Sequence, residues 1–455
     1  MCNPVRNFLR QPVRKSVIAA LLVTAFVSAQ ANAADLLQIY KDALANDAQY
    51  ASARASQVAG QEKAVQGRAG LLPAIALNGS DTKTNGNFSY DSPLYGSGSG
   101  SSLANSIQLQ LTQPLFRWAN WQQYEQGKLS VVASDAQFAQ AQQDLIIRVA
   151  QAYFDVLTAQ DNLITLHAQQ VAISEQLASA KRNFEVGTAT ITDTHEAQAR
   201  YDLVIAQEFA GQSDLQVKRS ALQQIIGKEA NDLAMLKVGI KLEEPKPQRI
   251  EDWVSSAEQQ NFNVVASQVA VEIAKRTIEI NRAGHYPTLD LVAGHARNSS
   301  GGQSAIANPS GVTTGNSIGL QWSVPIFSGF AVNSHVTEAI ALEDKARNDL
   351  ESARRTAALG ARQAYVGVTS GLAQVKAYEA AEISSQSALD SNKLGYQVGV
   401  RINIDVLNAQ QQLYTTRQTL AKSRYDTIMS GLRLKAASGI LKETDLLEIN
   451  ALLQH

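Results

Sequence analysis

Apolar and polar residues alternate at four places along the chain, near residues 73–79, 107–112, 288–291 and 318–324. A period of two puts the apolar side chains on one face of an extended segment, which predicts a β-strand between two different environments. The four strands form two candidate hairpins. The apolar positions are Ile75, Leu77, Ile107, Leu109, Leu111, Leu289, Leu291, Ile318, Leu320, Trp322 and Val324.

Gly, Ser and Asn fill the stretches between the paired strands, at residues 85–102 and 298–316. These residue types interrupt regular structure and favour turns. We therefore predict a mobile surface loop in each hairpin.

Very long helical stretches follow the hairpins, at residues 120–184 and 332–394, and neither contains a proline. About 60 residues at 1.5 Å each give a rod on the order of 90 Å. A short Gly-containing turn and a second helix, ending near Gly227 or Gly439, follow each rod. The first rod carries two apolar seams with three-four spacing, which suit both a tube of neighbouring helices and a compact bundle.

The hairpin and its helices occur twice in the chain. Val186-Gly187 returns as Val398-Gly399, at an offset of 212 residues. The offset changes only near the strands and the Gly/Ser-rich stretches, where insertions are tolerated. The sequence therefore predicts an internal duplication. Further matched pairs are Arg68-Ala69-Gly70 with Arg282-Ala283-Gly284, Gln151-Ala152-Tyr153 with Gln363-Ala364-Tyr365, Asp193 with Asp405, and Gly227 with Gly439.

The N-terminus predicts a cleaved secretory signal. Basic residues and a short apolar run precede the cleavage pattern Ala31-Asn32-Ala33. The one cysteine, Cys2, lies ahead of that run, so we expect no lipid anchor and no disulfide in the mature chain. Removing the four basic residues of the signal from 40 leaves 36 against 41 acidic ones, a net charge of −5. That balance gives no sign of a nucleic-acid partner.

The sequence carries no pattern typical of an enzyme. Its six histidines show no HExxH or other ligand spacing, and neither a P-loop nor a nucleophile elbow occurs. We therefore predict no catalytic residue, no cofactor and no metal site.

Outside the signal no run of 18 apolar residues occurs, so a membrane would have to be crossed by strands. Four strands cannot close a barrel, whereas three copies give twelve strands with room for a lumen. We predict a homotrimer, and the strand count alone leaves a tetramer open. Aromatic residues at the junctions of strand and helix suit a membrane edge or simple packing: Phe116, Trp118, Trp121, Phe327 and Phe330.

Six short motifs follow one another in a characteristic order: Leu109-Gln110-Leu111-Thr112-Gln113-Pro114, Phe184-Glu185-Val186-Gly187, Ile191-Thr192-Asp193, Arg282-Ala283-Gly284-His285-Tyr286-Pro287-Thr288-Leu289-Asp290-Leu291, Gly395-Tyr396-Gln397-Val398-Gly399 and Ile404-Asp405-Val406-Leu407. Their order and spacing resemble the TolC family of outer-membrane efflux and secretion proteins, over essentially the whole mature chain. The resemblance implies an α+β membrane protein with an internal two-fold repeat. Its homotrimeric 12-stranded β-barrel, with four strands per chain, would continue into a long α-helical barrel in the periplasm.

This resemblance divides the chain into eight expected segments: 1–33 signal peptide, 34–70 equatorial N-terminal helix, 71–118 first β-hairpin, 119–227 first long helix pair, 228–284 equatorial region, 285–329 second β-hairpin, 330–440 second long helix pair, and 441–455 C-terminal equatorial segment.

The resemblance also implies an entrance gate. Thr192, Asp193, Tyr396 and Arg401 match residues that keep the periplasmic entrance closed through hydrogen bonds and ion pairs between neighbouring helical hairpins. Considered without the resemblance, Arg401 and Asp405 would be an i,i+4 pair on one helix.

Two further groups follow from the same resemblance. Asp405 matches an acidic ring at the lumen constriction, and Asn408 stands where the family pattern has a second acidic residue, so we expect a weaker block by cations. The turns that match adaptor-docking tips also suit simple helix ends. Their residues are Val186, Gly187, Val398 and Gly399.

The implied partners are two further copies of the chain, a periplasmic adaptor, an inner-membrane pump of the ABC, RND or MFS type, and outer-membrane lipid. The chain would then be the exit duct of a tripartite efflux pump or type I secretion system for drugs, small toxic compounds or polypeptides. The residues alone leave one rival, a secreted coiled-coil adhesin or envelope spacer. That rival explains the signal and the rods but not the four two-faced strands.

Overall fold

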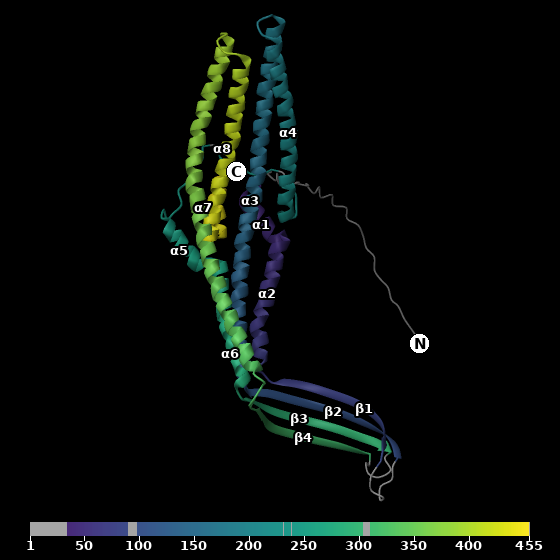
Figure 1. Ribbon diagram of the computed structural model, residues 1–455. Coiled ribbons are helices and arrows are strands. Elements are labelled where there is room, and N and C mark those ends of the chain that lie inside the picture. Colours follow the sequence, from purple (N-terminus) through teal and green to yellow (C-terminus); the bar gives the residue numbers. More distant parts are fainter. Residues whose placement is uncertain (1–33, 90–97, 231, 238, 304–309, 455) are drawn as a thin grey trace, which may run out of the picture.

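The computed structural model describes residues 34–89, 98–230, 232–237, 239–303 and 310–454. The chain is elongated, with a β-sheet at one end and long helices running away from it (Figure 1). The predicted signal peptide, residues 1–33, lies outside the described residues.

One antiparallel sheet holds the four described strands in their chain order, β1-β2-β3-β4. Leu77 pairs with Leu109, and Leu109 pairs on its other side with His295. The predicted hairpins are thus neighbours in one sheet. The strands are β1 (Ala74–Phe88), β2 (Gly98–Phe116), β3 (Thr288–Gln303) and β4 (Gly311–Ser323).

The strands extend well beyond the segments that alternation predicted. β1 continues to Phe88 and β2 begins at Gly98, while β3 reaches Gln303 and β4 begins at Gly311. Much of the predicted loops at 85–102 and 298–316 is therefore strand, and the loop prediction was wrong there. The reason is that neighbouring backbones satisfy each other's N–H and C=O groups, and this ladder needs no apolar side chain.

Two very long helices follow the hairpins, as predicted. α3 (Trp118–Glu185) has 68 residues and α7 (Ala331–Gln397) has 67. At 1.5 Å per residue each is about 100 Å long. Neither contains a proline, so no backbone hydrogen bond is interrupted from within. None of the described helices has both the length and the hydropathy that a membrane span requires.

Within the described chain, helices lie side by side in one layer (Figure 1). Near the sheet, α3 packs against α2 (Ala48–Ala69) and α6 (Phe262–Arg282), and α6 packs on α7. In the far half, α3 packs against α4 (Ile191–Ile226) and α8 (Asn403–Ala437), and α8 packs on α7. A single layer fits the wall of a tube, one of the two arrangements that the seams left open.

The residues that cap the helices recur at matching positions in the two halves of the chain. The side chains of Asp47 and Asn261 accept hydrogen bonds from the first backbone N–H groups of α2 and α6. Gly227 and Gly439, with φ angles of 73° and 74°, follow α4 and α8. A positive φ favours glycine, so these residues end the helices where the sequence predicted.

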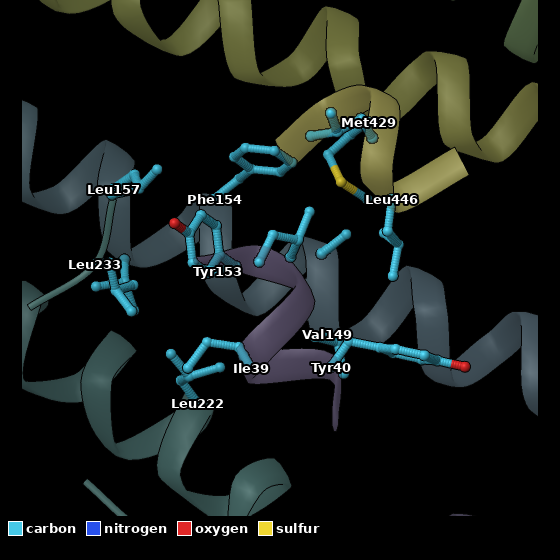
Figure 2. Packing of buried hydrophobic residues seen from close by; sticks show 14 of the residues in the cluster. Ile39, Tyr40, Val149, Tyr153, Phe154, Leu157, Leu222, Leu233, Met429 and Leu446 are labelled. Atoms are coloured by element: carbon cyan, nitrogen blue, oxygen red, sulfur yellow. The ribbon is translucent and has the colours of Figure 1, made fainter. Parts of the chain in front are cut away.

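The thickest apolar core lies midway along the rods, where α1 (Leu36–Asn46) and α9 (Glu443–Asn450) pack against α3, α4 and α8 (Figure 2). Tyr153 and Phe154 lie at its centre with exposed fractions of 0% and 1%. Burying one such side chain contributes about 1.5–3 kcal/mol. Smaller clusters hold the helices near the far end, so the hairpins are anchored most firmly at their base. The short helix α5 (Ile250–Gln260) packs on α7.

Candidate functional site

Both helical hairpins end in the same turn, at the end of the molecule opposite the sheet (Figure 1). Gly187 has a φ of 79°, and its N–H donates to the carbonyl oxygen of Phe184 at 3.0 Å. The N–H of Thr188 donates to the carbonyl oxygen of Asn183 at 2.8 Å. This pair of bonds is the Schellman motif, which requires the left-handed conformation that glycine adopts most readily.

The second hairpin repeats this geometry 212 residues later. Gly399 also has a φ of 79° and donates to the carbonyl oxygen of Tyr396 at 3.2 Å. Val400 donates to the carbonyl oxygen of Gly395 at 2.9 Å. The duplication therefore produces two tips with the same backbone shape at one end of the chain.

The tips are open and apolar. Val186 is 72% exposed, and Val398 and Val400 are 65% and 76% exposed. No atom lies within 4 Å of the position that a Cβ would take on Gly187 or Gly399. Apolar side chains with this much exposure, on turns fixed by backbone hydrogen bonds, form a surface suited to a partner.

The gate residues from the sequence lie close to these tips. Asp193 belongs to a capping box at the start of α4, where its carboxylate accepts from the hydroxyl of Thr190 at 2.8 Å. Asn403 Nδ2 donates to the backbone oxygen of Asp193 at 3.1 Å, which joins α8 to α4. Thr192 is exposed beside it. Within the described chain, the Asp193 carboxylate has no bond to Tyr396 or Arg401.

Tyr396 and Arg401 make separate contacts. The Tyr396 hydroxyl accepts a hydrogen bond from Asn183 Nδ2 at 3.1 Å, and so links the two hairpins. Arg401 pairs with Asp405 at 3.6 Å, with its side chain 59% exposed. The spacing is the i,i+4 one expected from the residues alone, but Arg401 lies in the turn before α8 begins at Asn403, so the two residues do not share one helix. An exposed pair of this kind contributes about 0–1 kcal/mol.

The residues predicted to form the lumen constriction, Asp405 and Asn408, lie one turn apart near the start of α8. The Asp405 side chain is 33% exposed. Asn408 is exposed, and its Oδ1 accepts a hydrogen bond from Arg200 Nη2 of α4 at 3.1 Å. A cation therefore lies one turn from Asp405, where sequence reasoning named only Asn408.

A row of amide bonds between α3 and the second hairpin was also missed. Gln176 donates to Asn403 Oδ1 at 2.6 Å, and Gln169 donates to Gln411 Oε1 at 2.9 Å. Together with Asn183 these donors recur every seventh residue of α3, which is two helical turns. The sequence signal for these bonds is the recurrence of an amide side chain at every seventh position of a seam that is otherwise apolar. We call Gln169, Gln176 and Asn183 with their partners the amide row.

Among the residues that the structure describes, no group of three or more His, Cys, Asp or Glu side chains could hold an ion.

Comparison with known proteins agrees with this architecture. The family described as "Outer membrane efflux protein" matches residues 39–228 and 253–440, which correspond to the two copies of the repeat. The chain is 33% identical to outer membrane protein TolC of Vibrio cholerae over 421 residues, covering 92% of this chain and 94% of that protein. It is 32% identical to the alkaline protease secretion protein AprF of Pseudomonas aeruginosa, covering 90% and 85%.

Solved structures share the fold. The outer membrane protein VceC of Vibrio cholerae superposes with a TM-score of 0.75 at 19% identity, over 89% of this chain and 96% of that one. The CmeC outer membrane channel of Campylobacter jejuni gives a TM-score of 0.76 at 17% identity, over 91% and 89%.

These matches confirm the predicted fold class, localisation and non-enzymatic channel function, and they decide against the adhesin or spacer. Members of the family function as trimers in tripartite systems, with strands in the outer membrane and helices in the periplasm. The chain belongs to the TolC family and is an outer-membrane efflux or secretion channel.

Proposed function

We propose that the trimer is the exit duct for an inner-membrane pump of the ABC, RND or MFS type, and that a periplasmic adaptor docks on its hairpin tips. The observation that carries this proposal is the pair of matching tips, each with an exposed valine beside a left-handed glycine. Three copies would present six such tips around one opening. Drugs, small toxic compounds or polypeptides would pass through the lumen.

The gate in this proposal lies just behind the tips. Thr192, Asp193, Tyr396 and Arg401 close the entrance across neighbouring hairpins, and the amide row holds the two hairpins of one chain together. Each neutral hydrogen bond of this kind stabilises the closed form by about 1 kcal/mol. A few such bonds per chain suit a gate, because an adaptor that binds the tips can compete with them.

The lumen constriction in this proposal contains Asp405 and Asn408. Three copies of Asp405 favour cations, while three copies of Arg200 beside Asn408 oppose them. We therefore infer weaker cation selectivity than a ring with two acidic residues would give.

Site-specific cross-linking tests the docking proposal. Cys2 is the only cysteine in the chain, so a cysteine introduced elsewhere in the mature protein is unique. Val398→Cys and Val186→Cys should cross-link to a cysteine at the helical tip of a co-expressed adaptor. Lys345→Cys, whose native side chain is 68% exposed near the sheet end of α7, should not. Efflux with cross-links only at position 345 would overturn the proposal.

A further inference from the structure

One face of the sheet is apolar and uncovered in the half next to the helices. Alternate residues of each strand share this face, and the register pairs Leu77 with Leu109 and Leu291 with Leu320. The opposite face carries Gln108, Gln110 and other polar or small residues. In an outer-membrane protein the apolar face is the one that contacts lipid. The large apolar side chains of this face that are at least 46% exposed are Ile75, Leu77, Leu103, Ile107, Leu109, Val312, Ile318, Leu320 and Trp322.

Two cationic side chains lie on this same lipid face. Arg297 pairs with Ile107, and Lys83 pairs with Leu103, so each shares the face of an exposed apolar neighbour. Both residues are exposed. His295 precedes Arg297 on the same face, with its Nδ1 2.6 Å from Oδ1 of Asn316.

The register also gives their height across the membrane. Arg297 lies eight residues beyond Leu289, which starts the face at the helix end, so it is about 27 Å along the strand. Lys83 is level with Gly301, twelve residues beyond Leu289, at about 41 Å. A strand tilt of about 40° turns these lengths into a height of roughly 21 Å for Arg297, and of roughly 25–37 Å for Lys83, because Lys83 lies two strands to the side of Gly301 in the tilted sheet. The two cations therefore bracket the outer edge of an apolar band about 25 Å tall.

Neither cation is neutralised within the described chain. No ion pair involves Arg297 or Lys83 among the described residues. The one carboxylate of the described strands on this face is Asp81, which accepts a hydrogen bond from Asn105. Two unpaired cations at the rim of a lipid-facing surface suit anionic headgroups.

We propose that Arg297 and Lys83 bind phosphate groups of the phosphorylated glycolipid in the outer leaflet of the outer membrane. Long basic side chains reach from the edge of an apolar band to the headgroup layer, and the apolar stem of each stays against lipid. The planar guanidinium of Arg297 can donate two parallel hydrogen bonds to phosphate oxygens, and the ammonium of Lys83 acts as a point charge. Each contact would orient the sheet in the asymmetric bilayer independently of pump docking.

Native mass spectrometry of the purified trimer with added lipid A tests this proposal. Each of Arg297→Gln and Lys83→Gln should weaken lipid A binding by about five-fold, and the double variant by roughly 25-fold. Asp81→Asn, which removes the opposing charge, should tighten it. Lys376→Gln on α7 makes the same change of charge away from the sheet and should leave binding unchanged.

A second arm needs only the wild-type trimer, and so holds even if the double variant fails to assemble. Dephosphorylated lipid A should bind the wild-type trimer at least ten-fold more weakly than lipid A does. Equal binding of lipid A and its dephosphorylated form to the wild type would overturn the proposal. So would undiminished lipid A binding by an assembled double variant.

Discussion

Asn183 donates a hydrogen bond from Nδ2 to the hydroxyl of Tyr396 at 3.1 Å, and the two residues are 213 positions apart in the sequence. The bond joins the tips of two helical hairpins whose common core lies far away, around Tyr153 and Phe154. Polar contacts of this kind, together with the small apolar cluster of Leu177, Ala180, Ala197 and Leu407, hold together an end of the hairpins that has far less buried apolar surface than the common core. Such an end can open without unfolding the core.

The first prediction concerns the base of the hairpins. Asp47 is 5% exposed and accepts from Arg148 Nη1 and Nη2 at 2.9 and 3.0 Å. These hydrogen bonds lower the pKa of Asp47. Its ionised form therefore stabilises the folded state above about pH 4, the pKa of an unfolded aspartate, and this contribution is lost as the pH falls through the lower folded pKa.

Asp47→Asn keeps a good N-cap and removes only the charge. We expect it to lower the free energy of unfolding at pH 7 by about 1.5–3 kcal/mol. The gap from wild type should shrink at pH 3, which is below the pKa of an unfolded aspartate, because the unfolded wild-type chain then takes up a proton that the folded chain, with its lowered Asp47 pKa, binds less readily. Urea midpoints of the detergent-solubilised protein at both pH values measure this. A gap of the same size at pH 3 and pH 7 would contradict the role given to the charge.

The second prediction concerns cation block. Asn408→Asp adds one negative charge per chain at the proposed constriction. The concentration of a multivalent cation that blocks half of the current should therefore fall, by roughly five-fold or more for each kcal/mol of added attraction. Arg200 should pair with the new carboxylate and offset part of the gain. Arg200→Gln combined with Asn408→Asp should therefore be blocked most tightly. Single-channel block curves that coincide for wild type and both variants would refute this.

The third prediction concerns the tips. Gly187→Val and Gly399→Val force an L residue to a φ of 79°, which costs about 1–2 kcal/mol at each position. We expect assembled trimers that no longer cross-link to the adaptor or support efflux. Gly239→Val is the matched control, because Gly239 has a φ of 75° and equally open space but lies away from the tips. Full efflux in the tip variants would show that the turns do not dock a partner.

Helix positions were predictable because their signals are local. The first rod was predicted at 120–184 and spans Trp118–Glu185, since the absence of proline and the glycine after the helix act within a few residues. Strand length was not predictable, because Gly98–Ser102 is strand only through its partners on β1 and, at Ser101 and Ser102, on β3. The left-handed turns at Gly187 and Gly399 were predictable for the same reason as the helices, because a glycine that follows a helix is a local signal.

Contacts between the hairpins could not be read from the chain. Arg200 meets Asn408 across 208 positions and Gln176 meets Asn403 across 227, and only the packed fold brings these pairs together. The polar residues that make these contacts can be seen in the sequence, at positions within the apolar seams. Their partners depend on how α3, α4 and α8 pack, which the seams left open.

The measurement closest to the central claim is planar-bilayer conductance of the detergent-extracted, unheated trimer. Tyr396→Phe removes the acceptor of the Asn183 bond, and Arg401→Ser removes the partner of Asp405. Tyr378→Phe with Lys376→Ser makes the same kinds of change earlier on α7 and serves as the control. A gated channel predicts small openings in wild type and control, and much larger ones in Tyr396→Phe with Arg401→Ser. Openings of equal size in all three, or a monomer without conductance, would contradict the gate and the channel respectively.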